Sequence, residues 1–166
     1  MKKLLFIVAF INVLLCNATT HLATTISEVN QLLNTALPND TVLLKDGIYK
    51  NAVIKFTNSN ILFIPQHAGK VFFQENSTLS FAGNKIVIDG FVWQNGGKDL
   101  NTKSVIEFKN NNEQASYSTV ANCIIDGYNT VDLNTDNKWI SMYGEYNTVT
   151  HCELKNKYNR GATLVV

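Results

Sequence analysis

The chain lacks an excess of charge of either sign. Its 166 residues include 14 Lys and Arg against 13 Asp and Glu, for a formal net charge of +1. A general nucleic-acid binder carries a strongly basic balance, so this composition argues against that class and leaves room only for a local basic cleft. The length predicts a single domain.

Cysteine is scarce, with three in the whole chain. Cys16 belongs to an apolar N-terminal segment, which leaves Cys123 and Cys152 for the rest of the chain. Two cysteines in a chain of this size do not make a disulfide framework. We therefore expect both to be small core residues.

Long hydrophobic runs are missing beyond the N-terminus. The one run there follows Met1-Lys2-Lys3, extends from Leu4 to Leu15 and leads into Cys16-Asn17-Ala18. It is shorter than the ~20 apolar residues that span a bilayer, and a basic start, an apolar centre and a small-residue end are typical of a secretory signal peptide. We predict a signal peptide over residues 1–18 and an exported, periplasmic or secreted mature chain. Lipoprotein anchoring at Cys16 is the alternative, although Leu15 stands where a small residue is usual.

Conventional catalytic motifs are absent from the sequence: it has no Gly-x-Ser-x-Gly, no phosphate-binding glycine loop, no His-Glu-x-x-His and no Cys-x-x-Cys. The segment from Asp132 to Asp136 has the opening spacing of a calcium loop, but Asn137 replaces the usual glycine and Tyr143 the bidentate glutamate. It is interpreted as an ordinary turn. The histidines lie far apart with no partner pattern, and each is interpreted as a surface or packing residue: His21, His67 and His151.

One helix is expected near the start of the mature chain. Thr25-Ile-Ser-Glu28 reads as a capping box, in which the Thr25 hydroxyl and the Glu28 carboxylate each accept a hydrogen bond from the other residue's backbone N–H. Pro38 ends the helix because it disfavours the helical conformation of the preceding residue. The apolar positions fall on one face at helical spacing: Ile26, Val29, Leu32, Leu33 and Ala36.

From residue 41 onward the sequence consists of short β-type runs separated by Asn, Gly, Asp and Ser clusters, a pattern of an all-β sandwich, barrel or solenoid. The predicted strands are Thr41–Leu44, Ala52–Phe56, Ile61–Ile64, Val71–Gln74, Leu79–Ala82, Lys85–Ile88, Phe91–Trp93, Val105–Lys109, Val120–Ile125, Trp139–Tyr143 and Thr148–Leu154.

Internal repetition favours the solenoid. Segments 84–91, 118–125 and 147–154 align without gaps, and their starts lie 34 and 29 residues apart, a suitable length for one coil of a parallel β-helix. Such coils stack like residues into ladders, so Cys123 and Cys152 should lie about 4.8 Å apart and stay free thiols. The 22 asparagines fit turns and amide ladders. A Greek-key sandwich, the second choice, would not predict gapless repeats.

The expected organisation is an all-β, right-handed parallel β-helix. Residues 19–37, with the helix, would cap the exposed edge of the first coil, and residues 38–166 would form the N-terminal coils of a β-helix domain that is incomplete at its C-terminal end.

A basic turn follows the last repeat. Lys155, Lys157 and Arg160 fall within six residues, interleaved with Tyr158 and Asn159. Arginine can grip a carboxylate with two hydrogen bonds and lysine can neutralise one as a point charge. In an exported β-helix this turn suggests an acidic polysaccharide ligand, with Lys157 and Arg160 as candidate contacts. The alternative is a set of solvated turn residues, which is the interpretation for Lys155.

The sequence resembles the N-terminal part of polysaccharide lyase family 6, the alginate lyase and chondroitinase B group. The resemblance covers the mature chain in order and is weaker in its first part, Ala36–Leu44 and Asp46–Tyr49, because many β-helix proteins share that pattern. It is most specific in Trp139–Gly144, Asn147–Cys152 and Asn159–Val166. The other matching stretches are Gly69–Val71, Ile86–Gly96, Ser118–Asn129 and Lys157. Asn39 stands where the family usually has glycine.

The resemblance implies β-elimination on a uronic-acid glycan, either alginate or a dermatan-type glycan. In the family, calcium neutralises the substrate carboxylate, a lysine acts as base and an arginine assists. These calcium-binding and catalytic residues lie on later coils, and nothing in residues 1–166 matches them, so no catalytic or metal role is transferred. Lys157 and Arg160 are carried over only as candidate glycan contacts.

Two hypotheses follow. The chain is the front part of an exported alginate-type lyase, inactive on its own and prone to aggregate at an open last coil, with a monomer expected at full length. Alternatively, it is a non-catalytic β-helix that binds acidic glycan or forms a surface structure.

Overall fold

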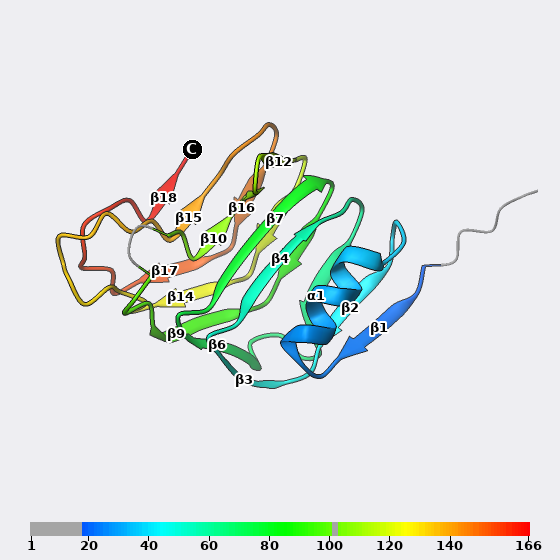
Figure 1. Ribbon diagram of the computed structural model, residues 1–166, viewed down its shortest axis with the longest axis horizontal. Coiled ribbons are helices and arrows are strands. Elements are labelled where there is room, and N and C mark those ends of the chain that lie inside the picture. Colours follow the sequence, from blue (N-terminus) through cyan, green and yellow to red (C-terminus); the bar gives the residue numbers. More distant parts are fainter. Residues whose placement is uncertain (1–17, 101–102) are drawn as a thin grey trace, which may run out of the picture.

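The computed structural model describes residues 18–100 and 103–166, and the predicted signal peptide lies almost entirely outside them. It is a right-handed parallel β-helix of about six turns with one short helix, as expected (Figure 1). The elements in chain order are β1 (Thr20–Ala23), α1 (Ile26–Thr35), β2 (Thr41–Leu44), β3 (Gly47–Lys50), β4 (Val53–Thr57), β5 (Leu62–Pro65), β6 (Val71–Glu75), β7 (Thr78–Asn84), β8 (Val87–Asp89), β9 (Val92–Gly96), β10 (Ile106–Glu107), β11 (Lys109–Asn110), β12 (Glu113–Ser116), β13 (Thr119–Ala121), β14 (Ile124–Asp126), β15 (Ile140–Ser141), β16 (Thr148–Thr150), β17 (Glu153–Lys155) and β18 (Leu164–Val165).

Three sheets form the sides of the solenoid. Sheet A runs β1-β2-β5-β8-β13-β16, and sheet B runs β3-β6-β9-β14-β17. Sheet C contains β4, β7, β10, β15 and β18 in this order, with the β11–β12 hairpin attached to β7. Apart from that hairpin, the paired strands are parallel, as the repeats predicted.

Helix α1 covers the open edge of the first coil. Its capping box is formed as predicted, with Thr25 accepting from the Glu28 N–H. Val29 and Leu33 face the core. On the neighbouring face, the Asn30 amide bonds Val53 O and Lys55 N, both at 2.9 Å, and the Asn34 amide donates to Lys55 O at 3.1 Å. Two side-chain amides one helical turn apart thus take the place of a further strand beside β4, which removes an edge open to pairing.

The stacking register corrects one of the two repeat alignments. Thr119 pairs with Thr148, which is the predicted spacing of 29 residues. However, Thr119 also pairs with Val87, a spacing of 32 rather than 34 residues. A shift of two residues leaves every side chain on the same face of a strand, because the strand period is two. The apolar pattern therefore matched in the wrong register as well as in the right one.

Residues with positive φ stand one above another at each corner of the coils. At the corner from sheet C to sheet A they are Asn39, Asn60, Lys85, Tyr117 and Tyr146. At the corner from sheet B to sheet C they are Asn51, Glu75, Asn95, Gly127 and Asn156, and from sheet A to sheet B they include Gly90, Asn122 and His151. Asparagine tolerates this conformation better than most side chains, which explains why the chain is so rich in it.

The corners also account for most errors in the predicted strands. The runs Val120–Ile125 and Thr148–Leu154 were predicted as single strands, but Asn122 and His151 turn the chain and divide each into one strand of sheet A and one of sheet B. The short strands β1, β3, β11, β12 and β18 were not predicted.

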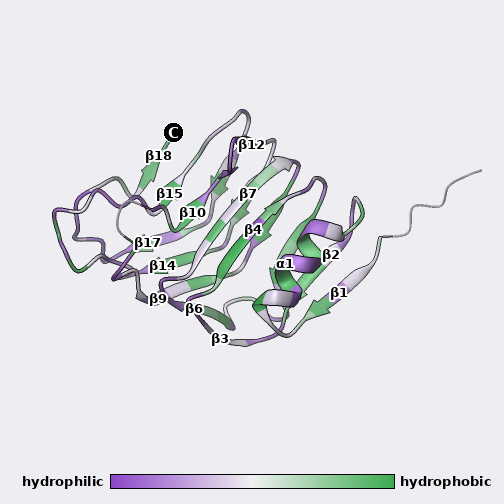
Figure 2. Ribbon diagram, viewed as in Figure 1, coloured by the Kyte–Doolittle hydropathy of each residue, from purple (hydrophilic) through white to green (hydrophobic). Residues whose placement is uncertain are grey.

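Aromatic stacks fill the interior. Phe56, Phe81 and Phe108 follow one another along sheet C, with ring centroids 6.0 and 4.7 Å apart. Phe63 lies 4.6 Å from Phe91. Figure 2 shows hydrophobic colour concentrated on strands and hydrophilic colour on many connecting segments. The ladders predicted from the repeats are therefore present in the core.

Candidate substrate groove

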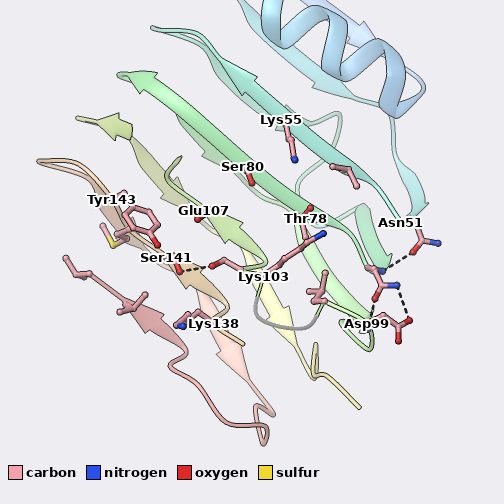
Figure 3. Close-up of a pocket in the computed structure, with 17 residues that line it drawn as sticks. Asn51, Lys55, Thr78, Ser80, Asp99, Lys103, Glu107, Lys138, Ser141 and Tyr143 are labelled. Carbon is pink, nitrogen blue, oxygen red and sulfur yellow. Dashed lines mark hydrogen bonds between the residues drawn. The ribbon is translucent and has the colours of Figure 1, made fainter. Parts of the chain in front are cut away.

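A groove of about 750 Å³ lies along the outer face of sheet C (Figure 3). We call it the sheet C groove; the residues that matter most for its chemistry are Lys55, Ser80, Lys103, Glu107, Lys138, Ser141 and Tyr143.

The floor of the groove is one rung of sheet C. Strand pairing places Lys55 beside Ser80, Ser80 beside Glu107, Glu107 beside Ser141 and Ser141 beside Val165. Their outward direction follows from the buried neighbours, since Ile54, Leu79, Ile106 and Ile140 are at most 1% exposed. Adjacent members of this floor ladder therefore lie about 4.8 Å apart along the solenoid axis.

One wall comes from the long connections between sheets B and C. Lys103 precedes β10 and Lys138 precedes β15, and both line the groove. The buried Asn137 connects them: its side-chain amide donates to Lys103 O, and it adjoins Lys138 in the chain. The Lys138 ammonium pairs with Asp136 at 3.0 Å. Asn137 therefore fixes the backbone positions of two groove cations.

The opposite side carries an aromatic ring. Tyr143 lines the groove, and the Lys109 ammonium lies 5.3 Å from its ring centroid. Between the two sides, the Ser104 and Ser141 hydroxyls are 2.7 Å apart. The groove thus combines cations, hydroxyls and one aromatic ring.

Lys157, a predicted glycan contact, does not line this groove. Its ammonium donates to Asn137 O at 3.0 Å and Asn159 Oδ1 at 2.7 Å, and lies 5.3 Å from the Trp139 ring centroid. Burial lowers the pKa of Lys157. In this position Lys157 supports the backbone next to Lys138.

Arg160, the other predicted contact, is exposed and also lies outside the groove lining. Its backbone N–H donates to Leu133 O at 2.7 Å. Lys155 pairs with Glu153 at 3.0 Å and Asp126 at 3.8 Å, and the Glu153 carboxylate raises its pKa. The structure thus does not bring the three cations of the basic turn together in one site.

The histidines remain apart from one another. His21 lies 3.1 Å from Asp40, whose pKa is lowered chiefly by backbone N–H donation from Thr19. His67 contacts Asp46 at 2.6 Å. His151 is an exposed corner residue with positive φ. None of the three lines the sheet C groove.

Cys123 and Cys152 are free thiols on successive coils, as predicted. Their following residues, Ile124 and Glu153, are register partners. Hydrogen bonding from the Cys123 thiol lowers the pKa of Cys152 to about 7, whereas the same contact and burial raise the pKa of Cys123.

Metal donors are not gathered in the part of the chain that the structure describes. Over residues 18–100 and 103–166, no three His, Cys, Asp or Glu side chains are placed to hold a metal ion. Asp132 instead bonds the Asn134 N–H within its own turn, at 2.9 Å. These residues do not fit a calcium ion, so no chemical step is assigned to one here.

A bilayer-spanning helix is likewise not found among the described residues.

The groove residues were missed because sequence spacing does not bring them together. Lys55, Lys103 and Lys138 stand on three different coils, and no local motif contains two of them. A correct repeat register would have aligned the floor ladder, and its alternation of inward and outward residues was the available signal.

The chondroitinase B family model matches residues 23–166. The chain belongs to the chondroitinase B family. Among solved structures, this family member is similar to the alginate lyase AlyGC of polysaccharide lyase family 6, with a TM-score of 0.82 and 28% identity. The similarity covers 87% of this chain but 20% of AlyGC.

Two further structures share the fold of this chondroitinase B family member. A mannuronic acid-specific family 6 lyase from human gut microbiota has a TM-score of 0.78 and 24% identity, over 88% of this chain and 36% of that one. A family 6 polysaccharide lyase from Pseudopedobacter saltans has a TM-score of 0.61 and 22% identity, over 87% and 36%. Curated protein sequences include no significant match.

Proposed function

We propose that this chain forms the first coils of an exported polysaccharide lyase that cleaves a uronic-acid glycan, alginate in the first instance, by β-elimination. The sheet C groove is its contribution to substrate binding. The observation that carries the proposal is the convergence of Lys55, Lys103 and Lys138 on one elongated groove in a member of this family.

The groove residues suit an acidic sugar chain. Lysine ammonium groups neutralise carboxylates as point charges, and a partly desolvated groove strengthens that attraction. The Tyr143 ring offers an apolar face with a polar hydroxyl, which fits a sugar ring that has both kinds of surface. Ser80 and Ser141 add hydroxyls that can donate to or accept from sugar hydroxyls.

In the proposed reaction these residues bind and orient the chain. Neutralising the uronate carboxylate makes the proton next to it easier to remove, and fixed cations contribute to that effect. The proton acceptor is not assigned to any described residue. Lys157 and Arg160 remain proposed glycan contacts outside the groove.

Binding of alginate oligosaccharides to the 166-residue chain tests the groove. We expect Lys103→Ala and Lys138→Ala each to weaken binding about five- to tenfold in calorimetry at low salt, with less effect at high salt. Lys70→Ala is the matched control, because Lys70 is an exposed lysine outside the groove lining. Equal weakening by all three variants would show non-specific charge attraction and contradict the groove assignment.

The reaction is tested separately by the ultraviolet absorbance of the unsaturated product. Binding without product would favour a non-catalytic glycan-binding role for this chain.

A further inference from the structure

Glu107 is an acidic residue in the middle of a groove whose proposed ligand is itself acidic. It lies on the floor ladder between Ser80 and Ser141, two strands away from Lys55 (Figure 3). Lys103 and Lys138 enter from the wall beside it. A carboxylate at the centre of these cations would ordinarily be explained by pairing with one of them.

Such pairing is not found. Among the described residues, the ion pairs of carboxylates involve Asp40, Asp46, Glu75, Asp126, Asp136 and Glu153, but not Glu107. Lys138 is paired with Asp136 instead. The Glu107 carboxylate is therefore available to a ligand in the groove.

The position of Glu107 is fixed by the backbone. Strand β10 lies between β7 and β15, and the adjacent Ile106 is fully buried. The Phe108 N–H donates to Ser141 O at 2.9 Å. Because the strand is held on both sides, the carboxylate is presented outward at one level along the axis.

We propose that Glu107 is a specificity-determining residue that reserves the centre of the groove for the hydroxyl-bearing edge of a sugar. A carboxylate accepts hydrogen bonds from sugar hydroxyls and repels a uronate carboxylate. The surrounding lysines accept the carboxylates of neighbouring sugars. The preferred ligand is a glycan whose charges alternate along the side that faces the floor, with a gap over Glu107.

This inference rests on the proposed function and is tested with two glycans of equal length. Alginate oligosaccharides carry a carboxylate on every sugar, whereas hyaluronan oligosaccharides carry one on every second sugar. We expect Glu107→Gln to tighten alginate binding about five- to tenfold and to change hyaluronan binding less than about twofold, because a neutral sugar can already lie over this position.

Glu113→Gln is the matched control. It makes the same change in net charge on the exposed β12 strand, outside the groove lining, and should change neither affinity. Thermal unfolding of both variants checks that they fold like the parent chain.

The outcomes separate the two proposals. If the parent chain binds both glycans and Glu107→Gln changes them by the same factor, or changes neither, the specificity role is wrong while the groove assignment stands. If the parent chain binds neither glycan, both proposals are wrong.

Discussion

The corner between sheets B and C takes two forms in this molecule. In the first two coils it is closed, and residues 51–52 and 76–77 alone join the strands. In the next three coils it is expanded to residues 97–105, 127–139 and 156–163. The expanded corners supply Lys103 and Lys138 to the sheet C groove. The closed corners contribute stacked amides, with the Asn76 N–H donating to Asn51 Oδ1 at 3.2 Å.

The comparison shows where this fold can vary without losing its register. Strands on either side of an expanded corner still pair residue by residue with the coils before and after them. The extra residues therefore change the surface beside sheet C while the stacking core is retained.

The largest expected effect is at the junction between the closed and the expanded form. A Cβ at Gly96 would lie 2.1 Å from Glu75 O and 2.5 Å from Tyr128 Cε2. Gly96→Ala should destabilise the chain by about 4 kcal/mol or more, because the contact is with backbone that cannot shift without breaking the coil. Urea unfolding measures this.

Gly127 is the comparison residue for that test. Its added Cβ would meet nothing within 4 Å, and its φ is +57°. Gly127→Ala should therefore cost only about 1–2 kcal/mol, the cost of the left-handed conformation. Similar losses for the two variants would contradict the close approach at Gly96.

A smaller effect is expected at Lys157, which supports the expanded corner of the fourth coil. Lys157→Met keeps the apolar stem but removes the bonds to Asn137 O and Asn159 Oδ1. We expect a loss of about 1.5 kcal/mol, at the lower end for a charged donor because the side chain is only partly buried. Groove binding should also weaken, since Asn137 adjoins Lys138.

The pH dependence gives Lys157 its own signature. Because burial lowers the pKa of Lys157, the unfolded chain binds more protons between that lowered pKa and the ordinary value. The Lys157 contribution to stability therefore rises with pH across this alkaline window. Lys157→Met should remove this rise, and an unchanged slope relative to the parent chain would contradict the role of burial.

The smallest effect is expected at the corner between sheets C and A. Lys85 has a φ of +55°. Lys85→Gly should relieve about 1–2 kcal/mol of backbone strain and lose about 0.5–1 kcal/mol to unfolded-state entropy, for a net gain of about 0.5 kcal/mol. Lys85→Val should instead destabilise, because a branched side chain fits this conformation poorly. Stabilisation by both would refute the strain argument.

The sequence predicted the helix, the solenoid class and most strands because those depend on local periodicity. Thr25, Glu28, Val29 and Leu33 each play the predicted part. The register between segments 84–91 and 118–125 was wrong by two residues, because strand alternation cannot distinguish even shifts. The groove was not predicted because its lysines come from separate coils, and their proximity depends on that register and on the shape of the expanded corners.

The stacked corner residues have a consequence for protein engineering. Gly127 and Asn156 keep the same corner conformation although the connections that follow them differ in length. Scaffold and groove wall are thus separable modules. A chimaera that exchanges residues 128–138 for the corresponding connection of a relative, with Gly127 and Trp139 kept as the junctions, should preserve the solenoid while acquiring a different groove wall.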